Sequence, residues 1–246
     1  MLHTEIERPS QLPLAPAAPR FDMYGAIHKA LRSMMGDTLV ALGATDAADD
    51  AAVESSLAKL EQLIAACASH LEHENRFVHP AIEARSPGTT ARIAEDHVGH
   101  ETALDELRAG ARAVRRAGAA YRGVVLGRLY RGLALFVAEN FEHMEREETV
   151  HNQALWDTYS DAELLAIHDE LVGSIPPAEM MQVLQWMIPS VSHAERAGML
   201  GGMRAQAPEG VFEAVLDLAY RSLSQREWAK LARTLGVPPV PGLVRC

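Results

Sequence analysis

The sequence predicts an all-α protein, with an up-down four-helix bundle followed by a smaller all-helical C-terminal region. Alanine and leucine are abundant, aromatic residues make up only 5% of the 246 residues, and β-branched residues form no alternating runs. Apolar residues instead recur every three or four positions over long stretches. Because that spacing places them on one face of a helix, both observations favour packed helices over a sheet.

Changes of pattern along the sequence divide the chain into four parts. Residues 1–20 contain several prolines and scattered charges, which indicate a flexible, solvated tail. Residues 21–159 carry the long amphipathic stretches and are predicted to form the bundle. Residues 160–236 contain shorter helical stretches separated by glycine and proline, and residues 237–246 are predicted to form a second tail.

Four long helices are expected in the first half of the chain. The first is expected to begin near Asp22, whose side chain can cap it. The second is predicted over about residues 52–85, the third after residues 88–90, and the fourth from about Tyr121. Short connections of this kind favour antiparallel neighbours in a bundle.

The overall charge and the cysteine content limit the classes of partner. The formal net charge is −10 and the pI is about 5.5, so a nucleic-acid surface is not an expected partner. No stretch is long and apolar enough to cross a bilayer, and the N-terminus lacks the apolar core of a signal peptide. Two cysteines, Cys67 and Cys246, cannot build a disulfide framework. We therefore expect a cytoplasmic protein without a membrane partner.

One motif recurs on three of the predicted helices: a histidine followed four residues later by a glutamate. On a helix this spacing puts both side chains on one face, about one turn apart. A single histidine, His28, lies on the apolar stripe of the first helix. The three pairs are His70 with Glu74, His97 with Glu101, and His143 with Glu147.

These polar residues occupy positions where apolar core residues are expected. In the fourth helix Asn140, His143 and Glu147 follow Phe136 along the same stripe. An ionised carboxylate buried in a core is unfavourable by several kcal/mol unless something pairs with it. In an up-down bundle, early positions of one helix lie level with late positions of the next. The four motifs should therefore meet at one height, where a metal ion could pair with several of them.

Taken singly, each of these residues has a simpler explanation. A lone histidine is more often a hydrogen-bonded core residue than a ligand, and a single His–Glu pair is more often a surface pair. We assign four further histidines to the surface, although His73 and His100 border the apolar stripe and either could join the site. The surface histidines are His73, His79, His100 and His151. A solvated acidic face is predicted for Glu72, Glu95, Asp96, Glu142, Glu145 and Glu148.

The number of candidate ligands argues for two metal ions. Four imidazoles and three carboxylates are too many for one tetrahedral zinc ion. They suit two divalent ions about 3.5 Å apart, bridged by carboxylate. Mixed nitrogen and oxygen donors without thiolate favour iron or manganese, with zinc as a substitute.

The pattern resembles the hemerythrin-like family, whose members carry the HHE cation-binding domain. The resemblance covers about residues 20–157, including residues 79–88 at the end of the second helix. It implies a left-handed four-helix bundle that holds an oxo- or hydroxo-bridged pair of iron ions. By position, Glu74 and Glu147 would be the bridging carboxylates. The other implied ligands are His28, His70, His97, His143 and, in the last place, Glu101.

Two departures from the family pattern bear on function. Oxygen-carrying members have His-x-x-x-His on the third helix and His-x-x-x-x-Asp on the fourth, where this chain has glutamate at the fourth position after each histidine. A carboxylate in place of an imidazole favours the oxidised metal, so oxygen transport is not expected. The resemblance instead implies sensing or buffering of iron, oxygen, nitric oxide or oxidants. The partner would be a small diatomic ligand or oxidant, and the protein would not be a dedicated enzyme.

Two other interpretations remain open at this point. One is a di-iron enzyme with peroxidase- or oxidase-like activity, because an open coordination position would permit turnover. The other is a helical interaction module in which the histidines and glutamates pair without metal. In the leading interpretation, the region after residue 160 transmits the metal state to a second copy of the chain or to a protein partner.

Overall fold

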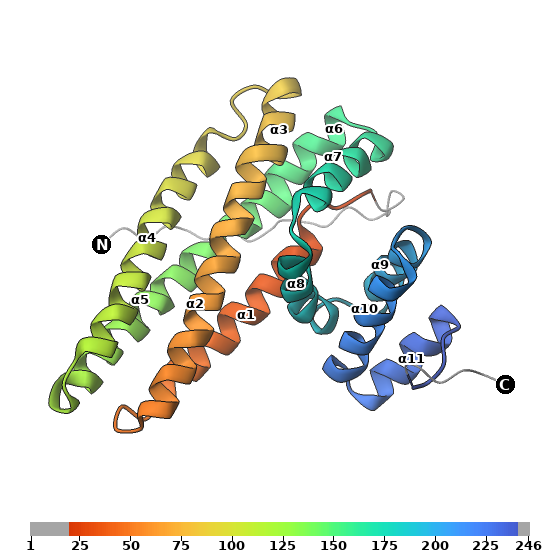
Figure 1. Cartoon of the computed structure of the whole chain (residues 1–246). Helices are drawn as coiled ribbons and strands as arrows, with labels where there is room; N and C mark the ends of the chain where they lie inside the picture. Colours follow the sequence, from red (N-terminus) through yellow and green to blue (C-terminus); the bar gives the residue numbers. More distant parts are fainter. Residues whose placement is uncertain (1–19, 241–246) are drawn as a thin grey trace, which may run out of the picture.

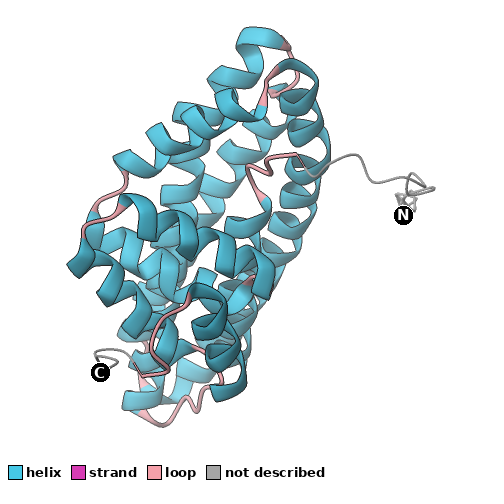
Figure 2. Cartoon of the chain, turned by 90° about the vertical axis from the view of Figure 1, so that its right-hand side faces the viewer, coloured by secondary structure: helices cyan, strands magenta, loops and turns pink. Residues whose placement is uncertain are grey.

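The computed structural model describes residues 20–240, and every regular element among them is a helix (Figure 2). Four long rods lie side by side, and five shorter helices follow at one side of them (Figure 1). None of the helices in these residues is long and apolar enough to span a membrane. The predicted fold class, a helical bundle followed by a smaller helical region, is confirmed.

Each rod of the bundle packs against its neighbours in the chain, and α1 also packs against α5, which closes the ring. The second and fourth rods each consist of three segments, because a π-helical turn joins two α-helices. The first and third rods are α1 (Gly25–Gly43) and α4 (Ala91–Arg116). The second rod comprises α2 (Asp50–His73), η1 (Glu74–Val78) and α3 (His79–Arg85). The fourth comprises α5 (Ala119–Arg146), η2 (Glu147–His151) and α6 (Asn152–Thr158).

The N-cap of α1 is Tyr24, which has no side-chain capping bond, and not Asp22 as predicted; Asp22 nevertheless bonds the start of the helix. Its Oδ1 accepts hydrogen bonds from the backbone N–H groups of Tyr24 and Gly25, at 3.0 and 2.9 Å. These are orphan donors at the start of the helix, which no intrahelical carbonyl can satisfy. The turn around Asp22 fixes how the chain enters the bundle, and therefore where His28 lies one turn further on.

Each π-helical turn begins at the glutamate of a His-x-x-x-Glu motif, Glu74 in η1 and Glu147 in η2. A π turn takes up one more residue than an α turn, and such turns are frequent at functional sites. Pro80 is the second residue of α3, directly after the π turn. At that position its missing N–H group disturbs the helix little.

The bundle core has two apolar clusters with a polar layer between them. One cluster fills the end of the bundle that holds Leu57, Leu104 and Leu133. The other surrounds Tyr24 and Ile82 at the opposite end. Along α1, the second rod and the fourth rod, the histidines and glutamates of the motifs lie between these clusters. The motif residues, with the exception of Glu101, therefore meet at one height in the core.

Five helices form the C-terminal region, in agreement with the shorter helical stretches predicted there. Helix α8 packs along α1, α10 packs on α8, and α11 packs on α9. Their second apolar core includes Leu184, Leu200 and Trp228. The helices are α7 (Asp161–Ser174), α8 (Pro177–Ser190), α9 (His193–Gln206), α10 (Glu209–Ser222) and α11 (Gln225–Leu235).

The C-terminal region is an internal repeat of 32 residues, which the sequence analysis missed. Ser160, Ser192 and Ser224 stand 32 residues apart. Each begins a helix with a capping box, in which the serine and the glutamate three residues later bond each other's backbone. The bounds of α7 and α8 recur 32 residues later as those of α9 and α10. The signal is a Ser-x-x-Glu tetrapeptide repeated at a constant period.

Parts of both predicted tails are attached to the fold. Arg20, placed in the N-terminal tail, bonds the side chain of Asp161 at 2.7 Å and the carbonyl groups of Trp156 and Tyr159. Val237 is buried, and the indole of Trp228 donates to the carbonyl oxygen of Pro239. The rest of the predicted tails, residues 1–19 and 241–246, lies outside the described residues.

Burial of Cys67 in the bundle core leads to a prediction about its reactivity. Burial raises the pKa of the Cys67 thiol to about 12, so almost no thiolate forms near neutral pH. In a Cys246→Ser variant, a thiol reagent such as Ellman's reagent should leave the native protein unmodified at pH 8. One thiol per chain should react after denaturation. Rapid labelling of the native variant would contradict the packing of α2 described above.

Candidate metal centre

The polar layer contains two clusters of potential metal ligands that share two carboxylates, Glu74 and Glu147. Within each cluster, one donor atom from every residue lies within 4.8 Å of all the others. The first cluster consists of His28, His70, Glu74 and Glu147. The second consists of Glu74, His97, His143 and Glu147.

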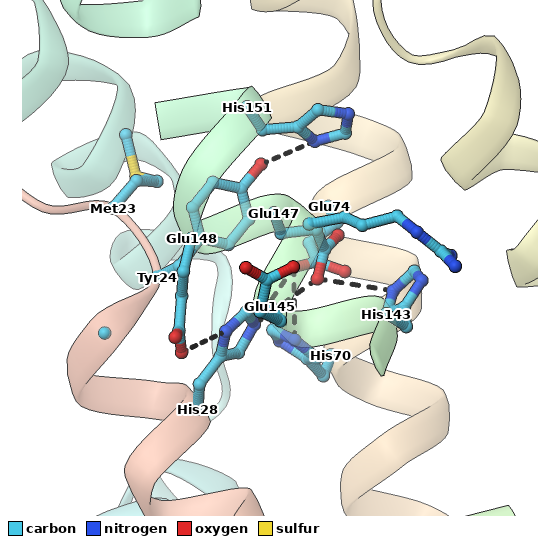
Figure 3. Close-up of polar contacts among 12 residues, drawn as sticks. Met23, Tyr24, His28, His70, Glu74, His143, Glu145, Glu147, Glu148 and His151 are labelled. Carbon is cyan, nitrogen blue, oxygen red and sulfur yellow. Dashed lines mark hydrogen bonds and ion pairs between the residues drawn. The ribbon is translucent and has the colours of Figure 1, made fainter. Parts of the chain in front are cut away.

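Within a helix, the four-residue spacing brings histidine and glutamate together as predicted. His70 Nε2 lies 3.1 Å from Glu74 Oε1, and His143 Nε2 lies 3.3 Å from Glu147 Oε2. Between helices, His28 Nε2 lies 3.5 Å from Glu147 Oε2. Figure 3 shows His28, His70 and His143 directed at the two carboxylates from three different rods.

Glu74 has the geometry of a bridging ligand. Its Oε1 faces the first cluster, 3.1 Å from His70 Nε2 and 3.8 Å from His28 Nε2. Its Oε2 faces the second cluster, 3.5 Å from His97 Nε2. Each oxygen of this carboxylate can therefore serve a different cation.

The donor atoms are buried and unsatisfied, which is the observation that tests whether a cation fits. Glu74 and Glu147 are 2% and 0% exposed, and none of their four carboxylate oxygens accepts a hydrogen bond from a described residue. The Nε2 atoms of His28 and His70 likewise have no hydrogen-bond partner there. Groups of this kind are strongly destabilising when buried alone, whereas metal coordination satisfies all of them. The donor set fits a cation.

The protonation equilibria of the site agree with cation binding. Burial lowers the pKa of His28, but the hydrogen bond to Glu148 and the negative charges of Glu74 and Glu147 outweigh it and raise the pKa to about 9. Burial raises the pKa of Glu74, but His70 and His28 hold it well below its ordinary value. The carboxylate is thus ionised at neutral pH, and a cation bound here would displace the proton of His28.

Two of the donor histidines also form a hydrogen bond through their other ring nitrogen. His28 Nδ1 lies 3.0 Å from Glu148 Oε1, and Arg32 forms two hydrogen bonds to the same carboxylate. His97 Nδ1 lies 2.8 Å from the side-chain oxygen of Asn75. Such contacts fix the ring orientation and the tautomer of a ligand histidine.

The predicted solvated acidic face is only partly correct. Glu148 and Asp96 are half-buried, because Glu148 bonds His28 and Asp96 forms an ion pair with Arg146 at 2.8 Å. Sequence spacing cannot distinguish these two half-buried residues from the exposed acidic residues, because all of them lie beside the apolar face of a helix. The four that are exposed as predicted are Glu72, Glu95, Glu142 and Glu145.

Glu101 does not reach the clusters. It is exposed and lines a surface pocket of about 470 Å³ with Glu72 and Asn75 among others. The four-residue spacing alone does not decide this, because it brings Glu74 to His70 and Glu147 to His143. In α4 the buried face runs through His97, His100 and Leu104, and Glu101 lies beside it.

Three of the four histidines assigned to the surface are in fact buried. His79, His100 and His151 are 7%, 4% and 0% exposed, whereas His73 is half-buried and belongs to no cluster. His100 packs its ring against His143 and Phe136 without joining a cluster.

His79 and His151 form a third cluster with Glu147. His79 directly follows η1, and His151 is the last residue of η2. A π turn rotates its residues less per step than an α-helix, so spacing counted on an α-helix misplaces both histidines. The available sequence signal was the Val-His dipeptide that follows two of the three His-x-x-x-Glu motifs, as Val78-His79 and Val150-His151.

Comparison with protein families gives a match to the hemerythrin HHE cation-binding domain over residues 21–155, more than half of the chain. The chain therefore belongs to the hemerythrin HHE family. Searches of curated proteins and of solved structures give no match. Family and geometry together identify a cation-binding protein whose site lies in the helical bundle.

The contact between His28 and Glu148 predicts the effect of a substitution outside the ligand set. Glu148→Ala should weaken metal binding by about 10- to 100-fold, because His28 loses the carboxylate that orients it. Competition with a chelator of known affinity measures this change. The matched control is Glu145→Ala on the same helix, since Glu145 is exposed; equal affinities for both variants would contradict the role of Glu148.

Proposed function

We propose that this protein holds a pair of iron ions and uses it to sense or buffer iron, oxygen, nitric oxide or oxidants in the cytoplasm. The observation that carries the proposal is that two donor clusters share Glu74 and Glu147. Two carboxylates common to two clusters are the arrangement that bridges two cations in a helical bundle.

The proposed ligand set has six residues. Each cation would have two imidazoles of its own and share both carboxylates, so neither would be fully coordinated by protein. We leave Glu101 out because it is exposed and belongs to no cluster. The set is His28 and His70 for one ion, His97 and His143 for the other, and Glu74 and Glu147 for both.

The chemistry of the donors supports iron. Imidazole nitrogen and carboxylate oxygen suit iron and manganese, whereas thiolate would favour zinc. Cys67 is in the apolar core and belongs to no cluster. A pair of iron ions with open positions supplies one-electron chemistry and binds small ligands. The protein's own residues bind the ions, orient them and exclude water from the bundle core.

A sensing role draws support from the contact between the site and the C-terminal region. Helix α1 carries His28 and packs along α8. Lys29, the next residue, forms an ion pair with Glu195 in the first turn of α9 at 2.5 Å. A shift of α1 on metal binding or oxidation would therefore reach the C-terminal helices, which could present it to a protein partner or a second copy of the chain.

Metal analysis tests the proposal directly. After anaerobic reconstitution with ferrous iron, we expect about two irons per chain and, on oxidation, an absorption band between 300 and 600 nm. Glu147→Ala should lose at least half of the iron, because both clusters share this residue. Glu101→Ala is the matched control, because Glu101 ends the same His-x-x-x-Glu motif but lies outside the clusters. This variant should keep both ions. One iron per chain, or none, in the wild type would contradict the proposal.

Addition of hydrogen peroxide to the same samples separates the sensor from the alternative enzyme. A sensor should give one stoichiometric spectral change. Sustained consumption of peroxide that Glu147→Ala abolishes would instead favour a peroxidase-like enzyme.

Hydrogen exchange tests the role of the C-terminal region in the full chain. On iron loading, amide exchange should slow in α8 and α9, because α8 packs on α1 and Glu195 bonds Lys29. Helix α11 is an internal control, since it packs on α9 and α10 and has no substantial contact with α1. Unchanged exchange in α8 and α9 would contradict transmission through these helices.

A further inference from the structure

His79 and His151 form a buried donor pair that the proposed ligand set does not use. They are 7% and 0% exposed, and the Nε2 atom of each has no hydrogen-bond partner among the described residues. One ring nitrogen of each lies within 4.8 Å of the other and of a carboxylate oxygen of Glu147. Two unsatisfied imidazoles beside a cation site need an explanation of their own.

Tyr24 fixes the tautomer of His151. The buried hydroxyl of Tyr24 lies 3.2 Å from His151 Nδ1, which is its only hydrogen-bond partner among the described residues. If Nδ1 carried the proton, the phenol proton would have no acceptor, and that is unfavourable in a core. Tyr24 therefore donates to Nδ1, and Nε2 of His151 carries an N–H group that remains free to donate.

His151 and the Tyr24 hydroxyl lie on one side of the carboxylates (Figure 3), and His79 packs between His151 and His97. In Figure 3, His151 and the Tyr24 hydroxyl lie above Glu74 and Glu147, whereas His28 and His70 lie below them. The ring of His79 meets that of His151 edge to face at 5.4 Å and stacks on the ring of His97 at 4.8 Å. A small ligand bound there would contact both donors and the second cluster.

The spacing of the pair suits a single acceptor between the two rings. Two N–H donors that each lie about 2.9 Å from one acceptor atom, at a tetrahedral angle, are about 4.7 Å apart. One ring nitrogen of His79 and one of His151 lie no more than 4.8 Å apart, an upper limit close to this distance. An acceptor of one to three atoms can therefore receive both hydrogen bonds.

Charge decides between an anion and a third cation. The carboxylates of Glu74 and Glu147 neutralise only half of the charge of two divalent ions. The layer would thus remain positive, which opposes a third cation and attracts an anion. Both rings can donate from Nε2 while neutral, and a hydrogen bond to a charged acceptor is stronger than one between neutral groups.

We propose that His79 and His151 form a binding site for a small hydrogen-bond-accepting anion of two or three heavy atoms, such as azide, nitrite or hydroperoxide, next to the second cluster. The inference rests on the proposed function, since the two cations supply the positive charge. The two π turns place these histidines beside the carboxylates, and Tyr24 orients one of them.

Azide titration of the iron-loaded protein tests the inference. Iron content is measured first in every sample, and the dissociation constant for azide then follows from the absorption change between 300 and 600 nm. His79→Leu and His151→Leu should each weaken azide binding by about tenfold or more with iron content unchanged. His151→Gln retains an N–H donor and should recover part of the affinity. His100→Leu, which removes an equally buried histidine outside the clusters, should bind azide like the wild type.

Three results would overturn the inference. One is an unchanged azide affinity in both leucine variants, or no azide binding by the wild type with two irons. Another is a third metal ion per chain that the leucine variants lose, which would make the cluster a cation site. The last is loss of iron from these variants, which would make the histidines ligands. If the wild type takes up no iron, the proposed function fails and this inference fails with it.

Discussion

Two ionised carboxylates buried in the centre of a helical bundle are the constraint on which the rest of this structure depends. Glu74 and Glu147 are almost fully buried, and none of their oxygens accepts a hydrogen bond from a described residue. An apolar core does not tolerate such groups alone, so the surrounding layer supplies imidazoles from all four rods and the geometry to hold cations. The apolar clusters on both sides of that layer keep water out and hold the rods in register.

The two π-helical turns adapt the backbone of the second and fourth rods to these buried carboxylates. Each starts at one of the two glutamates and takes up an additional residue before the α-helix resumes. In the second and fourth rods, the His-x-x-x-Glu pair and the histidine at the end of the π turn or directly after it therefore all face the polar layer. In a regular helix, the residues after Glu74 and Glu147 would be rotated further around the helix axis than they are in the π turns.

Much of the fold and of the site could be predicted from the sequence, and the failures share a cause. Apolar spacing located the four rods, and the conjunction of four motifs at one height located the polar layer. Both rely on a regular helical period. At η1 and η2 the number of residues per turn changes, so counting on an α-helical period misplaced His79 and His151. In α4 the period is regular, but the His-x-x-x-Glu motif wrongly predicted Glu101 as a ligand. Half-buried Glu148 was missed because its burial depends on Arg32 and His28 of another helix.

The first helix of the C-terminal repeat, α7, packs into the apolar core at one end of the bundle. Leu164 of this helix is fully buried with Val78, Ile82 and Leu155 of the bundle rods. Its counterpart 32 residues later, Arg196, is also buried but donates to the carbonyl groups of Ile188 and Val191. Because α7 shares this apolar cluster with the bundle rods, its stability depends on the bundle. A cation bound in the polar layer stabilises the native bundle, and with it this first repeat helix.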